Sequence, residues 1–164
     1  ELLDYVTTEK DHLLATILCK KARILYEKMQ YDNAATVIQC VQNMLPQDEN
    51  NNDMWSVLRG IVYQQLAEIG FRNGDVNIGE GRLEGNLNIS MNAYSSLPDE
   101  KLKYHYMGLV HHDMAILRWE YNDSYSDALD EIASAVECHR RCGYYQGAMN
   151  ALTLKAKVTL MLTR

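Results

Sequence analysis

The stretch of residues 13–46 constrains the fold more than any other part of this chain, because it reads as two amphipathic helices joined by a tight turn. Apolar residues recur in it at spacings of three and four, which places them on one face of a helix. The turn between Met29 and Asp32 is so short that the two helices must run antiparallel, and the ring of Pro46 ends the second helix. The first apolar stripe is Leu14, Leu18, Ala22, Leu25 and Met29, and the second is Ala34, Ile38, Val41 and Met44.

A hairpin of this size needs neighbours, so the rest of the chain has to cover it. An isolated helix of about 15 residues is marginal in water, and each buried Leu or Ile contributes only about 1.5 to 3 kcal/mol. The 164 residues include two prolines, 47% hydrophobic residues and 23% charged residues. This composition is typical of a globular and largely helical protein, with short Val and Ile runs as the only competing strand signal.

The same helical period recurs and predicts five more helices. Together with the first pair they form antiparallel hairpins at about 8–46, 53–95 and 98–142, followed by an unpaired helix at about 145–164. The stripes that predict the middle helices are Trp55, Leu58, Val62, Leu66 and Ile69; Leu83, Leu87, Met91 and Tyr94; Leu102, Tyr106, Val110, Met114 and Leu117; and Ala128, Ile132, Ala135 and His139.

Capping signals predict where several helices begin and end. Thr8 with Asp11, and Ser124 with Asp127, have the spacing of a capping box. Gly143 provides the left-handed residue that ends many helices. The other signals are Asp53 as an N-cap, Pro98 in a first helical turn, and Gly70 or Gly74 as a helix exit.

The last helix is apolar on two sides, which predicts that it is covered on both. One side carries Leu152, Ala156 and Leu160, and the other carries Leu154, Val158 and Met161. We therefore expect either that the parent protein continues past Arg164 with an eighth helix or that another chain packs there. The first residue is Glu rather than Met, which fits a segment of a longer protein.

Charge and cysteine placement narrow the classes of partner and compartment. A net charge of -6 and a pI near 5.3 disfavour nucleic acid and anionic membranes, because both would repel the chain. No apolar run approaches the roughly 18 residues of a membrane span. Cys19, Cys40, Cys138 and Cys142 all lie within helical patterns, which predicts reduced thiols in a cytoplasmic or nuclear protein.

Motifs for catalysis or cofactor binding are missing from the sequence. Gly79, Gly81 and Gly85 miss the dinucleotide-binding spacing by one position and follow no strand. No candidate nucleophile has the glycine elbow of a hydrolase. We therefore expect a protein that is not an enzyme and uses no cofactor.

One set of side chains could bind a metal. Cys138, His139 and Cys142 have helical spacing, and His111 and His112 could face them across a hairpin. Thiolate and imidazole together are the ligands that zinc prefers. We expect instead that the thiols are simply buried and the histidines partly exposed, so the sequence predicts no metal site, and zinc binding remains the alternative.

The hairpins share a residue pattern, which indicates internal repeats. In the turns, Tyr31, Asp32, Asn33, Ala34 and Ile38 match Tyr125, Ser126, Asp127, Ala128 and Ile132, and residues 74–79 occupy the corresponding turn between them. In the leading helices, Leu18, Lys21 and Ala22 match Tyr63, Leu66 and Ala67, and also Leu152, Lys155 and Ala156.

These residues resemble the tetratricopeptide repeat (TPR) family, which places Leu and a small residue in the leading helix, an aromatic residue at the turn and a small residue at the start of the second helix. The resemblance covers nearly the whole chain as about three and a half repeats. It implies an all-α fold of about seven helices, in which antiparallel hairpins form a right-handed superhelical stack, with residues 1–164 as one TPR-like segment.

The resemblance also implies a function, because leading helices line the concave groove of such arrays. A peptide or helix of another protein would bind there, which makes the chain a non-enzymatic adaptor segment of a larger intracellular assembly. The implied binding residues are Cys19, Arg23, Tyr26, Gln64, Glu68, Phe71, His112, Ile116, Trp119 and Lys157. The alternatives are a structural or self-association module that uses the bare face of the last helix, and a zinc-binding or enzymatic helical domain.

Overall fold

The computed structural model describes residues 2–46, 53–73, 80–120 and 124–163, and all its regular elements are helices. Within these ranges the prediction of an all-α protein with seven helices is confirmed. The helices are α1 (Leu2–Glu27), α2 (Tyr31–Met44), α3 (Asp53–Asn73), α4 (Glu80–Ser95), α5 (Glu100–Glu120), α6 (Tyr125–Cys142) and α7 (Tyr145–Leu162).

The chain divides into two compact units, each of which is described by itself below. Unit 1 is Glu1–Ala93 and contains α1, α2, α3 and most of α4. Unit 2 is Tyr94–Arg164 and contains α5, α6 and α7.

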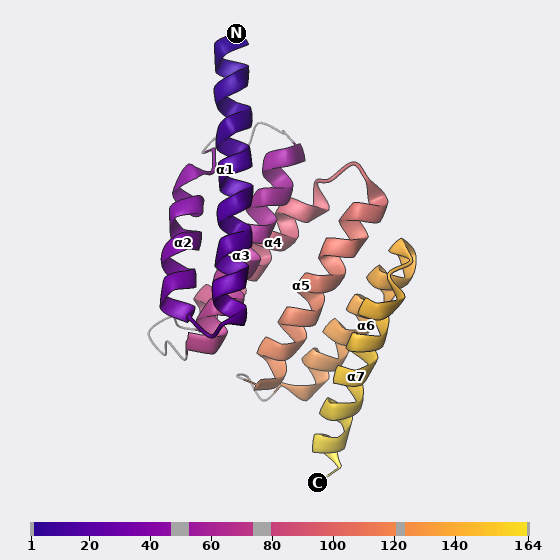
Figure 1. The fold of residues 1–164 in the computed structure, drawn as a ribbon. Helices are drawn as coiled ribbons and strands as arrows, with labels where there is room; N and C mark the ends of the chain where they lie inside the picture. The colour runs from indigo at the N-terminus through magenta and orange to yellow at the C-terminus, as the bar shows by residue number, and fades with distance from the viewer. Residues whose placement is uncertain (1, 47–52, 74–79, 121–123, 164) are drawn as a thin grey trace. The chain divides into compact units, whose positions relative to one another are not determined.

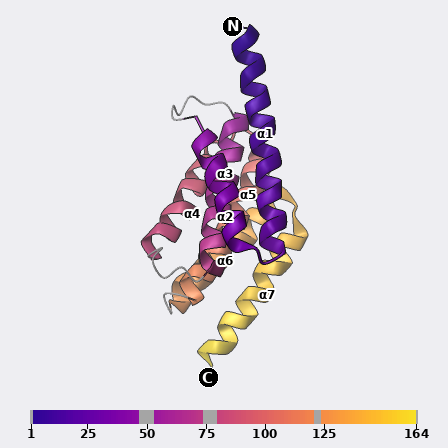
Figure 2. The ribbon, with the colours of Figure 1, turned by 60° about the vertical axis from the view of Figure 1, so that its left-hand side comes forward.

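In unit 1, α1 and α2 run antiparallel and α3 packs against both (Figure 1). The first turns of α1 extend beyond the ends of α2 and α3 in both views (Figures 1 and 2). The hydroxyl of Ser90 on α4 donates a buried hydrogen bond of 2.9 Å to the carbonyl of Gly60 on α3. The core of α1, α2 and α3 consists of Ala15, Cys19, Ala22, Ala34, Ile38, Val41, Trp55, Leu58, Val62 and Ile69.

The first helix differs from its prediction at its start and in its buried face. It begins at Leu2, so the capping box expected at Thr8 and Asp11 is wrong, because both positions lie inside a continuous helix. Ala15 and Cys19 lie in the core, whereas Leu14 is 48% exposed. Ala22 is buried as predicted, and Leu18 and Leu25 of the predicted stripe pack against the core. The buried face is therefore centred on small side chains, which let α2 approach closely.

Met29 is not part of the first helix, although the sequence placed it in the stripe. Its φ is 59°, and its side chain is 75% exposed. The Met29 amide donates to the carbonyl of Tyr26 and the Gln30 amide donates to that of Leu25, both at 2.9 Å. This is the Schellman arrangement, in which the left-handed position usually holds Gly.

The second and third helices agree with their predicted stripes. Ala34, Ile38 and Val41 are buried on α2, and Trp55, Leu58, Val62 and Ile69 are buried on α3. Gly70 was predicted as an exit but lies buried inside α3, which continues to Asn73. The alternative exit at Gly74 and the turn at 74–79 lie outside the described residues.

In unit 2, α5 and α6 run antiparallel, and α7 packs mainly on α6 (Figure 1). The core there consists of Ala115, Ala128, Ile132, Ala135, Ala151, Leu154 and Val158. Leu102 donates its amide to the Asp99 carboxylate at 2.9 Å, so Asp99 caps α5. Pro98 therefore precedes the helix rather than lying in its first turn.

The ends of α6 test two of the predicted caps. The Ser124 hydroxyl donates to the Asp127 carboxylate at 2.7 Å and makes no capping bond to the backbone, so the predicted capping box is not formed. Gly143 ends α6 as predicted, with a φ of 73°. The Tyr144 amide then donates to the carbonyl of His139 at 2.8 Å, which completes a second Schellman arrangement.

The last helix is covered on one side only in the part of the chain that the structure describes. Ala151, Leu154 and Val158 are buried, while Leu152 is 45% exposed and Leu160 is 64% exposed. The second apolar side is therefore open among these residues, and its cover by an eighth helix or by another chain stays a prediction. Among the described helices, none combines the length and the hydropathy needed to cross a membrane.

Candidate functional site

Three of the predicted binding residues lie together where α1 and α3 are adjacent. The Arg23 guanidinium on α1 forms an ion pair with the Glu68 carboxylate on α3 and lies 5.3 Å from the centre of the Tyr26 ring. The Tyr26 hydroxyl accepts a hydrogen bond of 3.4 Å from Arg72 on α3. We call these four residues, Arg23, Tyr26, Glu68 and Arg72, the α1–α3 surface.

The charged side chains of the α1–α3 surface are partly open to solvent. Arg23 also approaches Glu27 at 3.4 Å, and its side chain is 46% exposed against 19% for Glu68. Ion pairs of this exposure contribute less than about 1 kcal/mol each. The pairs therefore add little to the stability of the fold, and a charged ligand could exchange with them.

Among the predicted binding residues of unit 1, Cys19 is the buried one. Cys19 is 4% exposed and belongs to the core, and burial raises the pKa of its thiol to about 11. It therefore lies in the core and not on the α1–α3 surface. Gln64 and Phe71 are half-buried on α3.

The predicted binding residues of unit 2 do not form one surface patch. Ile116 and Trp119 pack against the core. His112 is half-buried, with a ring nitrogen 3.9 Å from the Asp113 carboxylate. Lys157 alone is exposed, on α7.

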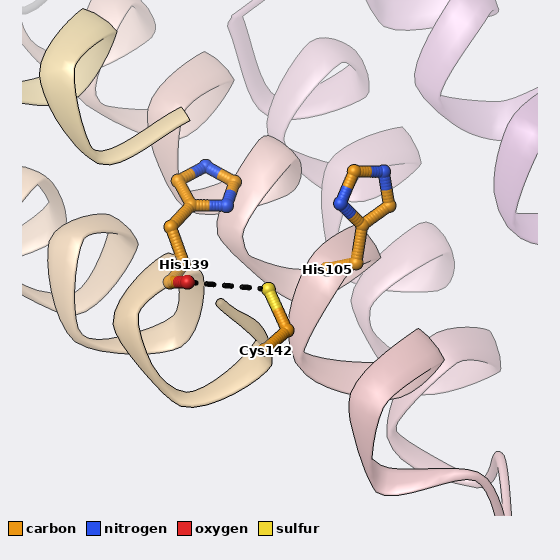
Figure 3. A group of neighbouring side chains, drawn as sticks. All are labelled: His105, His139 and Cys142. Atoms are coloured by element: carbon orange, nitrogen blue, oxygen red, sulfur yellow. Dashed lines mark hydrogen bonds between the residues drawn. The ribbon is translucent and has the colours of Figure 1, made fainter. Parts of the chain in front are cut away.

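A second candidate site lies between α5 and α6, where three side chains that can bind metals converge (Figure 3). His105 comes from α5, and His139 and Cys142 come from adjacent turns of α6. One ligand atom of each lies within 4.8 Å of the others. His139 and Cys142 point to the same side of α6, because residues three apart lie on one face of a helix.

The imidazole of His139 is held tightly from three sides. The residue is 1% exposed. A Cβ at Gly108 of α5 would lie 2.6 Å from this ring, and a Cβ at Gly147 of α7 would lie 2.8 Å from it. The Tyr144 ring packs edge-on at a centroid distance of 5.2 Å. Only glycine at positions 108 and 147 leaves space for this ring.

The environment of the cluster favours uncharged histidines. Burial, followed by the nearby His105 and His112, lowers the pKa of His139 to about 4. Burial also lowers the pKa of His105. Both rings are therefore neutral at pH 7, which is the form that binds metal ions.

The structure corrects the metal set considered from the sequence. His111 contacts Glu131 instead, with 2.7 Å between ring nitrogen and carboxylate oxygen. Cys138 is buried but lies outside the cluster. The predicted pair of His139 and Cys142 is present, and His105 takes the place expected for His111 or His112. The sequence signal that could have pointed to this ligand is the pair His105 and Gly108 on α5, a histidine three residues before a glycine.

Comparison with known proteins matches this chain to no family model, no curated protein and no solved structure. The two candidate sites therefore rest on the geometry of the chain itself.

Proposed function

We propose that the chain is a non-enzymatic protein-binding scaffold of TPR-like hairpins, stacked as a right-handed superhelix, and that a peptide or helix of another protein binds on the α1–α3 surface. The observation that carries this proposal is the convergence of Arg23, Tyr26 and Glu68 from two different helices. Tyrosine and arginine are the residue types that contribute most often to binding energy at protein interfaces.

The small residues of the repeat pattern support the stacked arrangement. Ala22, Ala34, Ala67 and Ala128 are all 0% exposed. Small side chains at these places let helix axes approach closely, which is the physical role that the TPR pattern gives them. Ala156 departs from the pattern, because it lies on the exposed side of α7.

A selection from a random peptide display library tests the proposal. Peptides enriched on the wild-type chain should lose about 1,000-fold in affinity for a variant with Arg23→Glu and Tyr26→Ala, because the two lost anchors contribute about 2 kcal/mol each. Circular dichroism should show unchanged helicity, since both side chains are partly solvated.

The matched control is Gln39→Glu, an exposed position on α2. This variant should bind the selected peptides as the wild type does. Equal binding by the double variant, or a loss that the control shares, would count against the α1–α3 surface.

A second candidate function, self-association, is favoured by the exposed apolar face of α7. Its large apolar residues include Leu152, which is 45% exposed, and Leu160, which is 64% exposed. Exposed apolar residues gathered on one helix mark interaction surfaces in many proteins. A second copy of the chain could cover this face.

Light scattering distinguishes the two functions. If the chain self-associates, the average molar mass of the wild type should rise with protein concentration. A variant with Leu152→Lys and Leu160→Lys should keep the molar mass of the monomer at all concentrations. Thr159→Lys, an exposed position on the same helix, adds charge without removing apolar surface and should still associate. A monomeric wild type at high concentration would exclude this second function.

A further inference from the structure

The side chains between α5 and α6 include a buried polar atom without a partner. Nδ1 of His139 makes no hydrogen bond, although the residue is 1% exposed. A buried polar atom left unpaired costs about 1 to 3 kcal/mol, so such atoms usually have a ligand or a structural role. Gly108 and Gly147 confine the ring, so it cannot rotate freely toward solvent.

The thiol of Cys142 provides a second donor close to this ring. Cys142 is 5% exposed, and its sulfur donates a hydrogen bond of 3.3 Å to the carbonyl of His139 (Figure 3). A thiol is a weak donor, so this bond is easily replaced by a stronger interaction of the thiolate.

The third donor, His105, approaches from the facing helix. Its ring is half-buried and contacts the Tyr144 ring at a centroid distance of 4.8 Å. In Figure 3 the two imidazoles and the sulfur of Cys142 surround a common space. A thiolate is a soft donor and imidazole is a borderline one, and together they suit Zn²⁺ much better than Mg²⁺ or Ca²⁺.

A cavity of about 370 Å³ reaches this space from one side. His105, Cys142 and Tyr144 line it, together with the oppositely charged Asp99 and Lys101. The cavity offers an entry path for an ion and room for water. A three-ligand zinc site leaves its fourth position to a water molecule.

We propose that His105, His139 and Cys142 bind one Zn²⁺ ion between α5 and α6, with a water molecule from the cavity as the fourth ligand. Binding converts the Cys142 thiol to a thiolate, and its proton passes to solvent. Ligand atoms of a tetrahedral zinc site are about 3.3 to 3.7 Å apart. In the structure the three ligand atoms lie up to 4.8 Å apart, so they must come about 1 Å closer together to bind the ion. Rotation of the half-buried His105 side chain can bring its ring nitrogen closer to the other two ligand atoms.

Cobalt substitution tests the site on the whole chain after removal of metals with a chelator. One equivalent of Co²⁺ should bind and produce the visible bands of a tetrahedral ion and a near-ultraviolet charge-transfer band from a thiolate. One equivalent of Zn²⁺ should abolish both signals. Failure of the wild type to bind either ion stoichiometrically at micromolar concentration would overturn the proposal.

Variants assign the ligands. Cys142→Ser should remove the charge-transfer band, and His105→Gln should weaken Co²⁺ binding by more than about 100-fold, because loss of a group that merely orients a ligand already weakens binding about 10- to 100-fold. Cys138→Ser and His111→Gln are matched controls on the same two helices and should bind as the wild type does. A charge-transfer band retained in Cys142→Ser, or lost equally in the controls, would refute the assignment.

A measurement without variants keeps the test valid if a variant fails to fold. Imidazole NMR signals of His105 and His139 in the wild type should shift on addition of Zn²⁺. The signal of His12, which lies on α1 in unit 1, should stay unchanged. Shifts at His12 alone, or at no histidine, would contradict the proposed site.

Discussion

Replacing Gly108 by Ala tests the packing around His139 directly. The new Cβ would lie 2.6 Å from Cε1 and 2.7 Å from Nδ1 of the His139 ring. The ring has little room to move away, because Gly147 and Tyr144 confine it. Helices α5 and α6 must therefore separate, or the ring must adopt another rotamer.

The expected change in stability is the difference between two effects. Ala is more favourable than Gly inside a helix by about 1 kcal/mol, whereas overpacking a confined site costs about 1 to 3 kcal/mol. Because the clash is severe and the ring is buried, we expect a net loss of about 1 to 2 kcal/mol in the free energy of unfolding of unit 2. Gly85→Ala on α4 is the matched control, since a Cβ there meets no atom within 4 Å, and it should stabilise unit 1 by up to about 1 kcal/mol.

The two tryptophans allow the units to be followed separately. Trp55 lies in unit 1 and Trp119 in unit 2. Urea unfolding monitored by tryptophan fluorescence in a Trp55→Phe background therefore reports on unit 2. Trp119→Phe provides the reciprocal background for the Gly85→Ala control.

A double-mutant cycle with His139→Ala identifies the cause of the loss. Removing the imidazole removes the clash, so Gly108→Ala should then be neutral or stabilising, with a coupling energy of about 2 kcal/mol. The reasoning is refuted if Gly108→Ala stabilises unit 2 when His139 is present. It is refuted equally if the loss is the same in both backgrounds.

Three further predictions address other features of the structure. The folded-state pKa of His139, about 4, lies below its usual 6.5, so the stability that its neutral form contributes is complete above pH 6.5 and is lost as the pH falls toward 4. Relative to His139→Phe, metal-free wild type should lose about 2 to 3 kcal/mol between about pH 7.5 and pH 4.5 in urea unfolding, and a difference that does not change with pH would contradict this. Met29→Gly should raise the free energy of unfolding of unit 1 by about 1 kcal/mol, because the φ of 59° at Met29 is strained for any residue but glycine and its side chain, 75% exposed, contributes little packing. Unchanged or lower stability in chemical unfolding would argue against backbone strain at position 29. Ser90→Ala should lower the stability of unit 1 by about 1 kcal/mol through loss of its bond to Gly60, measured by Trp55 fluorescence in the Trp119→Phe background. The control Thr36→Ala, at an exposed hydroxyl of unit 1 that bonds to a carbonyl of its own helix, should change little in the same assay.

The helices were predictable because their signals are local. Apolar stripes such as Ala34, Ile38 and Val41 predict which face of a helix is buried. Gly143 predicts a helix end, because glycine readily adopts the left-handed backbone conformation found there. The errors arose where several faces or signals compete. Leu14 was assigned to the core although the small residues Ala15 and Cys19 occupy it, because hydrophobicity alone does not report how closely a neighbouring helix approaches.

The candidate sites were predictable only in part, because they depend on how residues far apart in sequence meet. Arg23, Tyr26 and Glu68 were found through repeat alignment, since equivalent positions of successive hairpins lie side by side. His139 and Cys142 were found from helical spacing. His105 was missed because pairing it with His139 requires the register between α5 and α6, which apolar stripes do not determine to within one turn.

The close fit of one imidazole between two glycines also limits how this sequence can change during evolution. A Cβ at position 108 would overlap the ring of His139, whereas a Cβ at position 147 would overlap the rings of both Tyr144 and His139. Orthologues should therefore keep Gly108 and His139 or replace them together, with a small side chain at position 139 wherever alanine or serine occupies 108. Orthologues that combine histidine at position 139 with a residue larger than glycine at position 108 would show that α5 and α6 can move apart to make room for both side chains.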